Sequence, residues 1–347
     1  MGKLKLILTA DYEIFGNGQG CVKKCIVEPT NRILDICDKY GAKLTLFVDV
    51  CEYWAFKRAA VNGLLKEPNL PHILIEKQLI DVVKRGHDIQ LHFHPQWLDA
   101  EYQDNRWKVN NEYWRLPNVS KHPTWSIDKL FKEGKNTLEE IIQPIKPEYS
   151  CNIFRAGSWC IQDEEEVLDA MRKNNFIIDS TVASGMSLNN QHTFYNFKST
   201  PNQPSWKIHN KVTLASEHGS ITEIPIFSLL VPWYYNFYFK ILKLINNISF
   251  TPTGCINKNK KIYSSNHFSS LFKNHYRMFN FCDATTFQEL KYFANFAIKK
   301  YMNIILDQDV PVVVIGHPKT FGNDKDFERF LSWISKKEIF CFSKYFV

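Results

Sequence analysis

The sequence lacks an apolar run long enough for the core of a signal peptide. Residues 1–9 carry only a short apolar run, which leads directly into Asp11 and Glu13. A signal peptide needs a longer apolar core followed by a small-residue cleavage site. We therefore expect a first β-strand here and a cytoplasmic location.

Typical transmembrane sequence is also lacking. Residues 229–250 are apolar and strongly aromatic, but Asn236, Lys240 and Lys243 interrupt them. Such a segment makes a poor membrane-spanning helix. Two interpretations stay open for it, namely peripheral contact with a membrane surface, and packing against the body or a partner.

Cys-x-x-Cys motifs and polybasic arms are absent as well. The nine cysteines are scattered, and no histidine lies near Cys21 and Cys25 to complete a zinc site, so free thiols in a reducing compartment are expected. The 43 basic and 36 acidic residues are spread along the chain and leave a net charge of +7. This mild excess argues against a nucleic-acid partner, and it is typical of an ordinary solvated surface that favours anionic partners only weakly.

What the sequence does contain is an alternation of strand-like and helix-like segments over 347 residues, 44% of them hydrophobic. That pattern predicts an α/β fold with a buried parallel sheet. We expect one domain over 1–347, with an aromatic insertion at about 96–125 and an aromatic and basic one at about 228–281. The expected strands are 5–9, 44–48, 88–94, 152–156, 176–178, 221–226 and 310–315, and the expected helices are 29–40, 76–85, 126–142, 163–174 and 286–306.

A strand with two histidines is the central motif. It begins after Gly86 and ends at Pro95, and side chains alternate along a strand, so His92 and His94 lie on the same face. Two such imidazoles can share a metal ion. On this stretch alone, polar residues at a sheet edge are an equal alternative, because a metal site needs a third ligand.

Other polar residues follow the same rule of position. Asp11, Arg155, Asp179 and His317 each lie at the C-terminal end of an expected strand. In a β/α barrel, active sites are assembled from several strand ends on that face. The shared location therefore favours a site over scattered surface residues.

These motifs, in their order and spacing, resemble the NodB-type polysaccharide deacetylases, and in particular a variant branch associated with surface polysaccharide biosynthesis. The resemblance rests on residues 9–13, 45–48, 86–95, 154–157, 179–181, 223–225 and 316–318. It implies a distorted (β/α)7-type barrel and a metal-dependent hydrolase that removes an N-acyl group, usually acetyl, from an amino sugar. It also implies residue roles: Asp11 as catalytic base, Arg155 as its partner, His317 as general acid, Asp179 as the carboxylate that orients this acid, and His92 as a metal ligand.

Two departures from the family pattern change the expected ligand set. Tyr12 stands where the family has a second aspartate, and Gln96 stands where it has a second metal histidine. We expect Glu13 and His94 to replace them, although Asp11 and Glu13 share a strand face and leave their roles exchangeable. Two histidines and a carboxylate with open positions suit a divalent transition metal, with zinc as our prediction.

The substrate side is less defined. Aromatic residues of the 96–125 segment either stack on sugar rings or pack on the body, and we predict substrate contacts for Trp97, Trp159 and Glu223. The expected partner is an amino sugar, a sugar nucleotide or a glycan precursor. Two alternatives stay open, namely an amidase for a small non-sugar amide and a catalytically silent carbohydrate-binding barrel.

Overall fold

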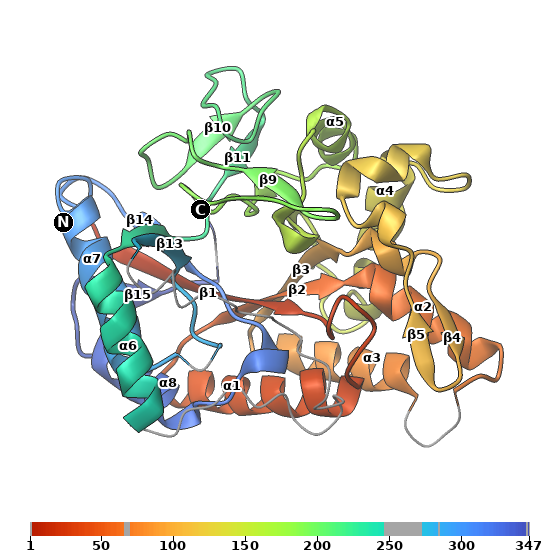
Figure 1. Ribbon diagram of the computed structural model, residues 1–347, viewed down its shortest axis with the longest axis horizontal. Helices are drawn as coiled ribbons and strands as arrows, with labels where there is room; N and C mark the ends of the chain where they lie inside the picture. The colour runs from red at the N-terminus through yellow and green to blue at the C-terminus, as the bar shows by residue number, and fades with distance from the viewer. Residues whose placement is uncertain (1, 66–69, 246–272, 284, 345, 347) are drawn as a thin grey trace.

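The computed structural model describes residues 2–65, 70–245, 273–283, 285–344 and 346, and a curled sheet forms its centre (Figure 1). The strands of this sheet are β1 (Leu4–Tyr12), β2 (Leu44–Asp49), β3 (Asp88–Phe93), β6 (Ile153–Ala156), β7 (Ile178–Asp179), β10 (Trp206–Ile208), β11 (Ile221–Glu223), β14 (Val310–Val314) and β15 (Phe340–Phe342). Their order is β10-β11-β7-β6-β3-β2-β1-β14, and β15 pairs with the start of β1. All neighbours are parallel except β10, which runs antiparallel to β11.

The sheet curls until its two ends meet. Just beyond β11, Ile226 forms parallel bridges to Ala183 and to Val313 of β14, and the Phe227 N–H donates to the Val313 carbonyl at 3.0 Å. The parallel strands β1, β2, β3, β6, β7, β11 and β14 therefore surround a common interior. This confirms the predicted distorted (β/α)7-type barrel.

Two buried apolar layers follow from strand alternation. In β1, Ile7 points into the barrel together with Phe47 and Val313, whereas Leu6 and Leu8 belong to the larger core on the outer face of the sheet. Asp11 has the same parity as Ile7. The alternation thus carries the β1 side chain Asp11 toward the barrel interior at the C-terminal end of the strand.

Helices cover the outer face of the sheet, as Figure 1 shows. Ser126 and Thr286 cap the N-termini of α4 and α7, where each side chain accepts a hydrogen bond from the third residue of its helix, and Asp49 caps α2 in the same way. The helix bounds are α1 Glu28–Lys39, α2 Val50–Val61, α3 Pro71–Lys84, α4 Ile127–Ile142, α5 Glu165–Lys173, α6 Trp233–Ile245, α7 Phe287–Tyr301 and α8 Asp324–Ile334. None of the described helices is long and apolar enough to cross a membrane.

Segments between the expected strands and helices contain short antiparallel pairs. Within 96–125 the chain forms β4 (Glu101–Gln103) and β5 (Arg106–Lys108), and within 184–220 it forms β8 (Ser187–Asn189), β9 (Phe194–Asn196) and β10. In the second insertion β12 (Ser228–Val231) pairs with β13 (His275–Met278). The rest of that insertion, 246–272, lies outside the described residues, including the end of the predicted 229–250 segment.

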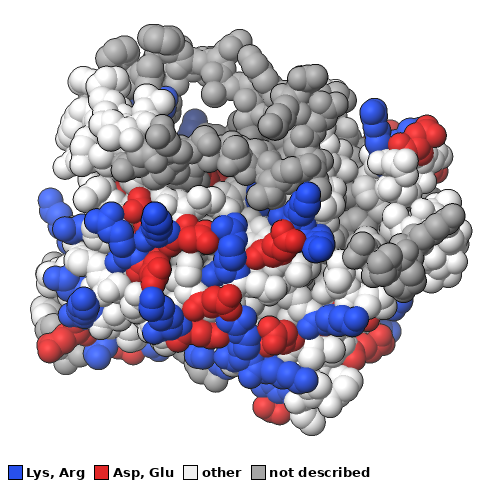
Figure 2. All heavy atoms as spheres, turned by 90° about the horizontal axis from the view of Figure 1, so that it is seen from below, with Lys and Arg blue, Asp and Glu red and all other residues white. Residues whose placement is uncertain are grey.

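Charged side chains of both signs alternate on the face seen in Figure 2. On the helices of the barrel exterior, Arg32 pairs with Asp324 at 2.8 Å, and Arg85 pairs with Asp35 and Asp38 at 2.8 and 2.7 Å. This face therefore has the character of the mixed, solvated surface expected from the charge balance.

Candidate active site

Strand ends from opposite sides of the barrel bring the predicted polar residues together. β1 delivers Asp11 and, one step past its end, Glu13, while β3 delivers His92 and its continuation His94. β6 delivers Arg155, β7 delivers Asp179, and the turn after β14 delivers His317. Because parallel strands end on one face, residues separated by up to three hundred positions in the sequence become neighbours.

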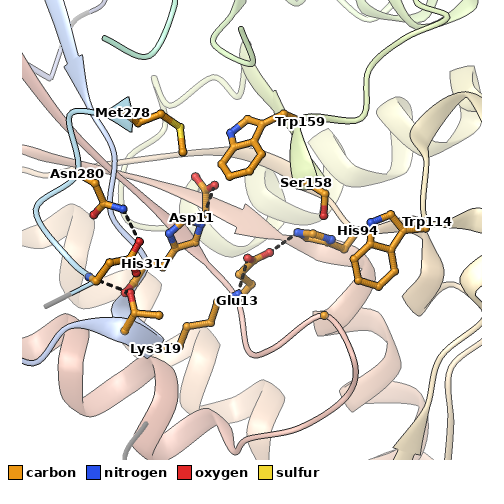
Figure 3. Close-up of a pocket in the computed structure, with 13 residues that line it drawn as sticks. Asp11, Glu13, His94, Trp114, Ser158, Trp159, Met278, Asn280, His317 and Lys319 are labelled. Carbon is orange, nitrogen blue, oxygen red and sulfur yellow. Dashed lines mark hydrogen bonds and ion pairs between the residues drawn. The ribbon is translucent and has the colours of Figure 1, made fainter. Parts of the chain in front are cut away.

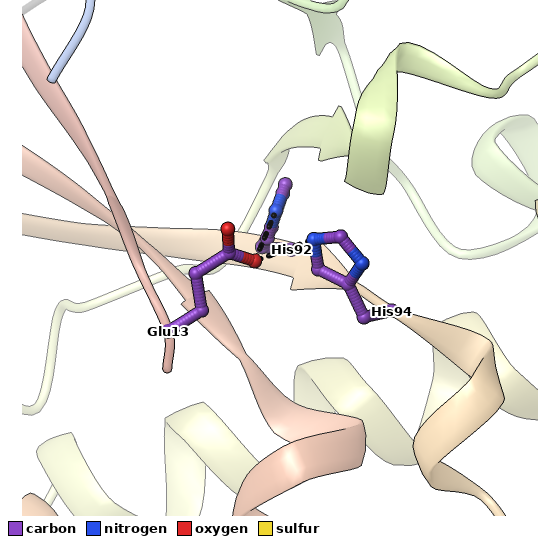
Figure 4. A group of neighbouring side chains, drawn as sticks. All are labelled: Glu13, His92 and His94. Carbon is purple, nitrogen blue, oxygen red and sulfur yellow. Dashed lines mark ion pairs between the residues drawn. The ribbon is translucent and has the colours of Figure 1, made fainter. Parts of the chain in front are cut away.

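Glu13, His92 and His94 form a buried group that could hold a metal ion (Figure 4). Oε2 of Glu13 lies 3.4 Å from His92 Nε2 and 2.5 Å from His94 Nε2. Ligand atoms around a tetrahedral zinc ion are separated by roughly 3.4 Å, so the first distance fits and the second is that of a hydrogen bond in the absence of metal. Among the described residues, His92 Nε2 is buried without a hydrogen-bond partner, as expected of an atom that serves as a ligand.

Neighbouring groups fix the orientation of the two rings. His92 Nδ1 lies 2.7 Å from the Arg155 carbonyl oxygen, so Nδ1–H donates there and the Nε2 lone pair faces Glu13. His94 Nδ1 lies 3.1 Å from the side-chain amide of Gln96. The Gln96 Oε1 atom is buried and unsatisfied, and rotation of the amide would let it accept the Nδ1–H of a ligating His94. Gln96 thus orients the ring of His94, the histidine that we expect to ligate the metal in place of the family histidine at the position of Gln96.

Backbone contacts hold the histidine strand at a fixed depth. Asp49 Oδ1 accepts from the His94 N–H at 3.1 Å. At residue 157 a Cβ atom would lie 2.2 Å from the Phe93 carbonyl oxygen and 2.9 Å from the His94 ring. Gly157 is therefore required for β6 to pass so close to His94.

Lys319 is a member of the site that the sequence did not predict. Its Nζ donates to Glu13 Oε1 at 2.6 Å and to the Ile14 carbonyl at 2.9 Å. Burial opposes ionisation of Glu13, but His94 and Lys319 more than offset it and hold the pKa of Glu13 well below its ordinary value. With Oε1 held by Lys319, the ionised carboxylate presents Oε2 to the histidines. The only sequence signal for Lys319 was its position two residues after His317.

Asp11, Arg155 and His317 form a second group beside the first. Arg155 is fully buried, and its Nη1 donates to Asp11 Oδ1 at 2.7 Å and to Thr9 Oγ1 at 3.0 Å. His317 Nε2 lies 3.5 Å from Asp11 Oδ2. Burial alone would raise the pKa of Asp11, but Arg155, His92 and His317 outweigh it, so this pKa is far below its ordinary value. The structure thus separates the two exchangeable carboxylates, placing Glu13 with the histidines and Asp11 with the arginine.

Two predictions about buried carboxyl groups need correction. Asp179 was expected to orient His317, but its partners are Thr181, whose hydroxyl donates at 2.6 Å, and Glu223. Glu223 was expected to contact substrate, but it is fully buried and accepts from the Val182 N–H at 3.1 Å. Burial raises the pKa of Asp179 to about 6, and burial and the Asp179 charge raise the pKa of Glu223 well above normal. Asp179 and Glu223 therefore form a buried pair of carboxyl groups of their own, and no described contact joins either of them to His317.

A pocket of about 480 Å³ opens above both groups (Figure 3). Its lining includes the charged and imidazole side chains of both groups and of Lys319, namely Asp11, Glu13, His94, His317 and Lys319. The aromatic and polar residues that complete its lining include Trp114, Ser158, Trp159, Met278, Asn280 and Asp283.

Of the two tryptophans predicted to contact substrate, one lines this pocket and the other does not. Trp159 lines the pocket and packs edge-on against Tyr195 at 5.8 Å, so its contact with substrate stays a prediction. Trp97 is wrong as a substrate contact, because it is fully buried against Phe56 and Trp107 with ring centroids 5.8 and 5.4 Å away. The 96–125 segment contributes Trp114 instead.

No family model matches the chain, and no curated protein matches it. Polysaccharide deacetylases are among the solved structures similar to it. A protein described as a polysaccharide deacetylase from Mycobacterium smegmatis is 12% identical, with 98% of this chain and 87% of that chain covered and a TM-score of 0.46. The Puue allantoinase is 12% identical, with 99% of this chain and 88% of that chain covered and a TM-score of 0.46. A protein described as a polysaccharide deacetylase from Pseudomonas aeruginosa PAO1 is also 12% identical, with 99% of this chain and 88% of that chain covered and a TM-score of 0.45. At this identity and overlap, no activity or residue role is carried over from these proteins.

Proposed function

We propose that this protein is a metal-dependent hydrolase that removes an N-acyl group, most simply acetyl, from an amino sugar used in glycan precursor biosynthesis. One observation carries the proposal, namely that the Glu13–His92–His94 group and the Asp11–His317 pair face the same pocket. Amide hydrolysis needs both an electrophilic group for the carbonyl and groups that move protons.

Glu13, His92 and His94 would hold the ion, and their two nitrogens and one oxygen suit zinc. A divalent ion there supplies Lewis acidity to the amide carbonyl and lowers the pKa of a nearby water. The chain supplies an ionised carboxylate and orients the His92 ring. Lys319 and the histidines hold Glu13 ionised, and the Arg155 carbonyl keeps the proton of His92 on Nδ1, away from the ion.

Asp11 and His317 would do the proton transfer. Asp11 Oδ2 accepts the proton of the attacking water, and His317 Nε2, 3.5 Å from this oxygen, delivers a proton to the departing amine. Once His317 has given its Nε2 proton to the amine, it takes up the proton that Asp11 received from the water, and both groups return to their starting states. The pair would thus act as a relay, with Arg155 holding Asp11 in place at 2.7 Å.

The pocket lining suits a neutral sugar. Trp114 and Trp159 provide indole faces for a sugar ring, and Ser158 and Asn280 provide hydrogen-bond groups for hydroxyls. Carboxylates outnumber ammonium groups in the described lining, where Asp283 adds to Asp11 and Glu13 and Lys319 is the ammonium group. A diphosphate gains little there, so we propose an N-acyl sugar in a glycan or in free form over a sugar nucleotide.

The test combines zinc binding with acetate release. After chelation, zinc titration calorimetry should give one site per chain, and His94→Ala should weaken binding by about a hundredfold, whereas His218→Ala, an exposed histidine, should not. Acetate release from N-acetylglucosamine and its oligomers should be lost in His317→Ala and Asp11→Asn but kept in Asp163→Asn.

Three outcomes would refute the proposal. Binding of only a trace of zinc after loading would remove the metal centre. Sugar binding without acetate release by the zinc-loaded protein would favour a silent carbohydrate-binding barrel, and release from small non-sugar amides alone would favour the amidase alternative.

A further inference from the structure

Helix α6 presents an uninterrupted apolar face to solvent. Leu244 and Ile245 are 77% and 70% exposed, and side chains at helical spacing extend the same face toward the start of the helix. The other members of this face are Tyr234, Phe237, Tyr238 and Ile241. Contiguous apolar surface of this kind marks a binding face in a folded protein.

The opposite side of α6 is packed firmly on the body. The ring centroids of Tyr235 and Phe239 lie 4.5 and 5.6 Å from that of Tyr292 in α7, and Lys243 pairs with Glu289 at 3.5 Å. These contacts fix α6 flat against α7, along one edge of the molecule in Figure 1. The exposed face is therefore a rigid part of the surface.

The charges on this helix point to the kind of partner. α6 contains no acidic residue, and its two lysines are Lys243, which pairs with Glu289, and Lys240, which is exposed at the border of the apolar face. An apolar face without carboxylates and with one exposed lysine, Lys240, at its border complements an anionic lipid surface.

Length and residue type favour a lipid surface over a membrane core. The 13 residues of α6 extend about 20 Å at 1.5 Å per residue, which is less than the roughly 30 Å of a bilayer core. Tyrosines such as Tyr234 and Tyr238 are enriched where a bilayer meets water. The helix is thus suited to lie in the interface.

We propose that the exposed face of α6 docks this protein reversibly on anionic phospholipid membranes. The strand pair next to α6 in the chain also carries exposed apolar side chains, since Leu230 of β12 pairs with Tyr276 of β13 and both are exposed. β13 then ends at Met278, which lines the pocket. Docking through α6 consequently brings the pocket near the lipid surface.

The test is sedimentation of the full-length protein with sucrose-loaded vesicles. The protein should bind vesicles of phosphatidylglycerol and phosphatidylcholine, and bind vesicles of phosphatidylcholine alone far less. The double variant Phe237→Ser with Leu244→Ser should have a partition coefficient at least tenfold lower. Each of the two substitutions removes the transfer free energy of about one apolar side chain that docking would bury in the lipid. Lys240→Gln should lower it about fivefold on anionic vesicles only.

A matched control removes exposed apolar side chains elsewhere. Val61 and Leu214 are 79% and 57% exposed, and Val61→Ser with Leu214→Ser should bind vesicles like the unmodified protein. Circular dichroism should show equal folding of both double variants. Equal vesicle binding by both, or no binding of the unmodified protein to anionic vesicles, would overturn the proposal. A change in oligomeric state in the α6 variant without vesicle binding would instead identify a contact between protein chains.

Discussion

The pair of Arg155 and Asp11 offers the sharpest test of the site, because both partners are buried. Arg155 is fully buried and donates to Asp11 at 2.7 Å, to Thr9 at 3.0 Å and to the Ser180 carbonyl at 2.8 Å. Arg155→Met keeps the volume but leaves the ionised Asp11 without its partner. Breaking a buried pair in this way costs roughly 3–5 kcal/mol of unfolding free energy.

The double variant isolates the interaction between the two charges. In Arg155→Met with Asp11→Asn, neither charge remains, so most of the penalty of the single variants should disappear. We expect the sum of the two single losses to exceed the loss of the double variant by about 2 kcal/mol. The measurement is urea unfolding at neutral pH with EDTA present, so that metal binding does not contribute.

Arg329 is the control, because its pair with Asp326 at 3.3 Å involves a side chain that is 63% exposed. Arg329→Met should cost less than about 1 kcal/mol. If Arg155→Met costs no more than this control, or if the two single losses simply add, then Asp11 is not held by Arg155 and the proposed relay loses its basis.

Three further predictions concern the pocket and the layer beneath it. The folded state binds more protons than the unfolded state because the pKa values of Asp179 and Glu223 are raised, so their stabilising contribution is complete below about pH 4 and is lost as the pH rises past about 6. The melting temperature of Glu223→Gln should therefore fall less between about pH 4 and pH 7 than that of the unmodified protein. An identical dependence of melting temperature on pH in the two proteins would contradict this. Trp97→Ala should cost roughly 3–5 kcal/mol of unfolding free energy, since the indole is fully buried, and a loss under about 1 kcal/mol in a urea titration would place it outside the core. Trp114→Ala should raise KM for N-acetyl sugars about tenfold with little change in unfolding free energy, and an unchanged KM would remove Trp114 from the sugar wall.

The strands that carry the site were predictable, and the reason is local. β14 is a β-branched run that suits a strand buried on both faces, and the histidine strand is bounded by Gly86 and Pro95. α2 was missed because Val50–Val61 has apolar residues on several sides and buries most of them, so no single apolar stripe appears. Its cap, Asp49, lies at the end of β2 and gave no separate signal.

The sequence could not predict which partner each buried carboxylate would have. Asp11 and Glu13 lie two positions apart, but Asp11 meets Arg155 whereas Glu13 meets His94. That difference depends on which strand ends the closed barrel places nearby, which is long-range information. The same holds for Trp97, which follows the histidines in sequence and yet packs away from the pocket.

Arg155 joins the two halves of the site through two different parts of one residue. Its backbone carbonyl accepts from His92 Nδ1–H at 2.7 Å, whereas its guanidinium holds Asp11. A substitution removes the guanidinium and leaves the carbonyl. The variant that combines Arg155→Met with Asp11→Asn, which is expected to regain stability, should therefore bind zinc like the unmodified protein by calorimetry and release no acetate. Loss of zinc binding in that variant would mean that the metal group depends on the charges of the neighbouring pair, and the two halves would then be one inseparable unit.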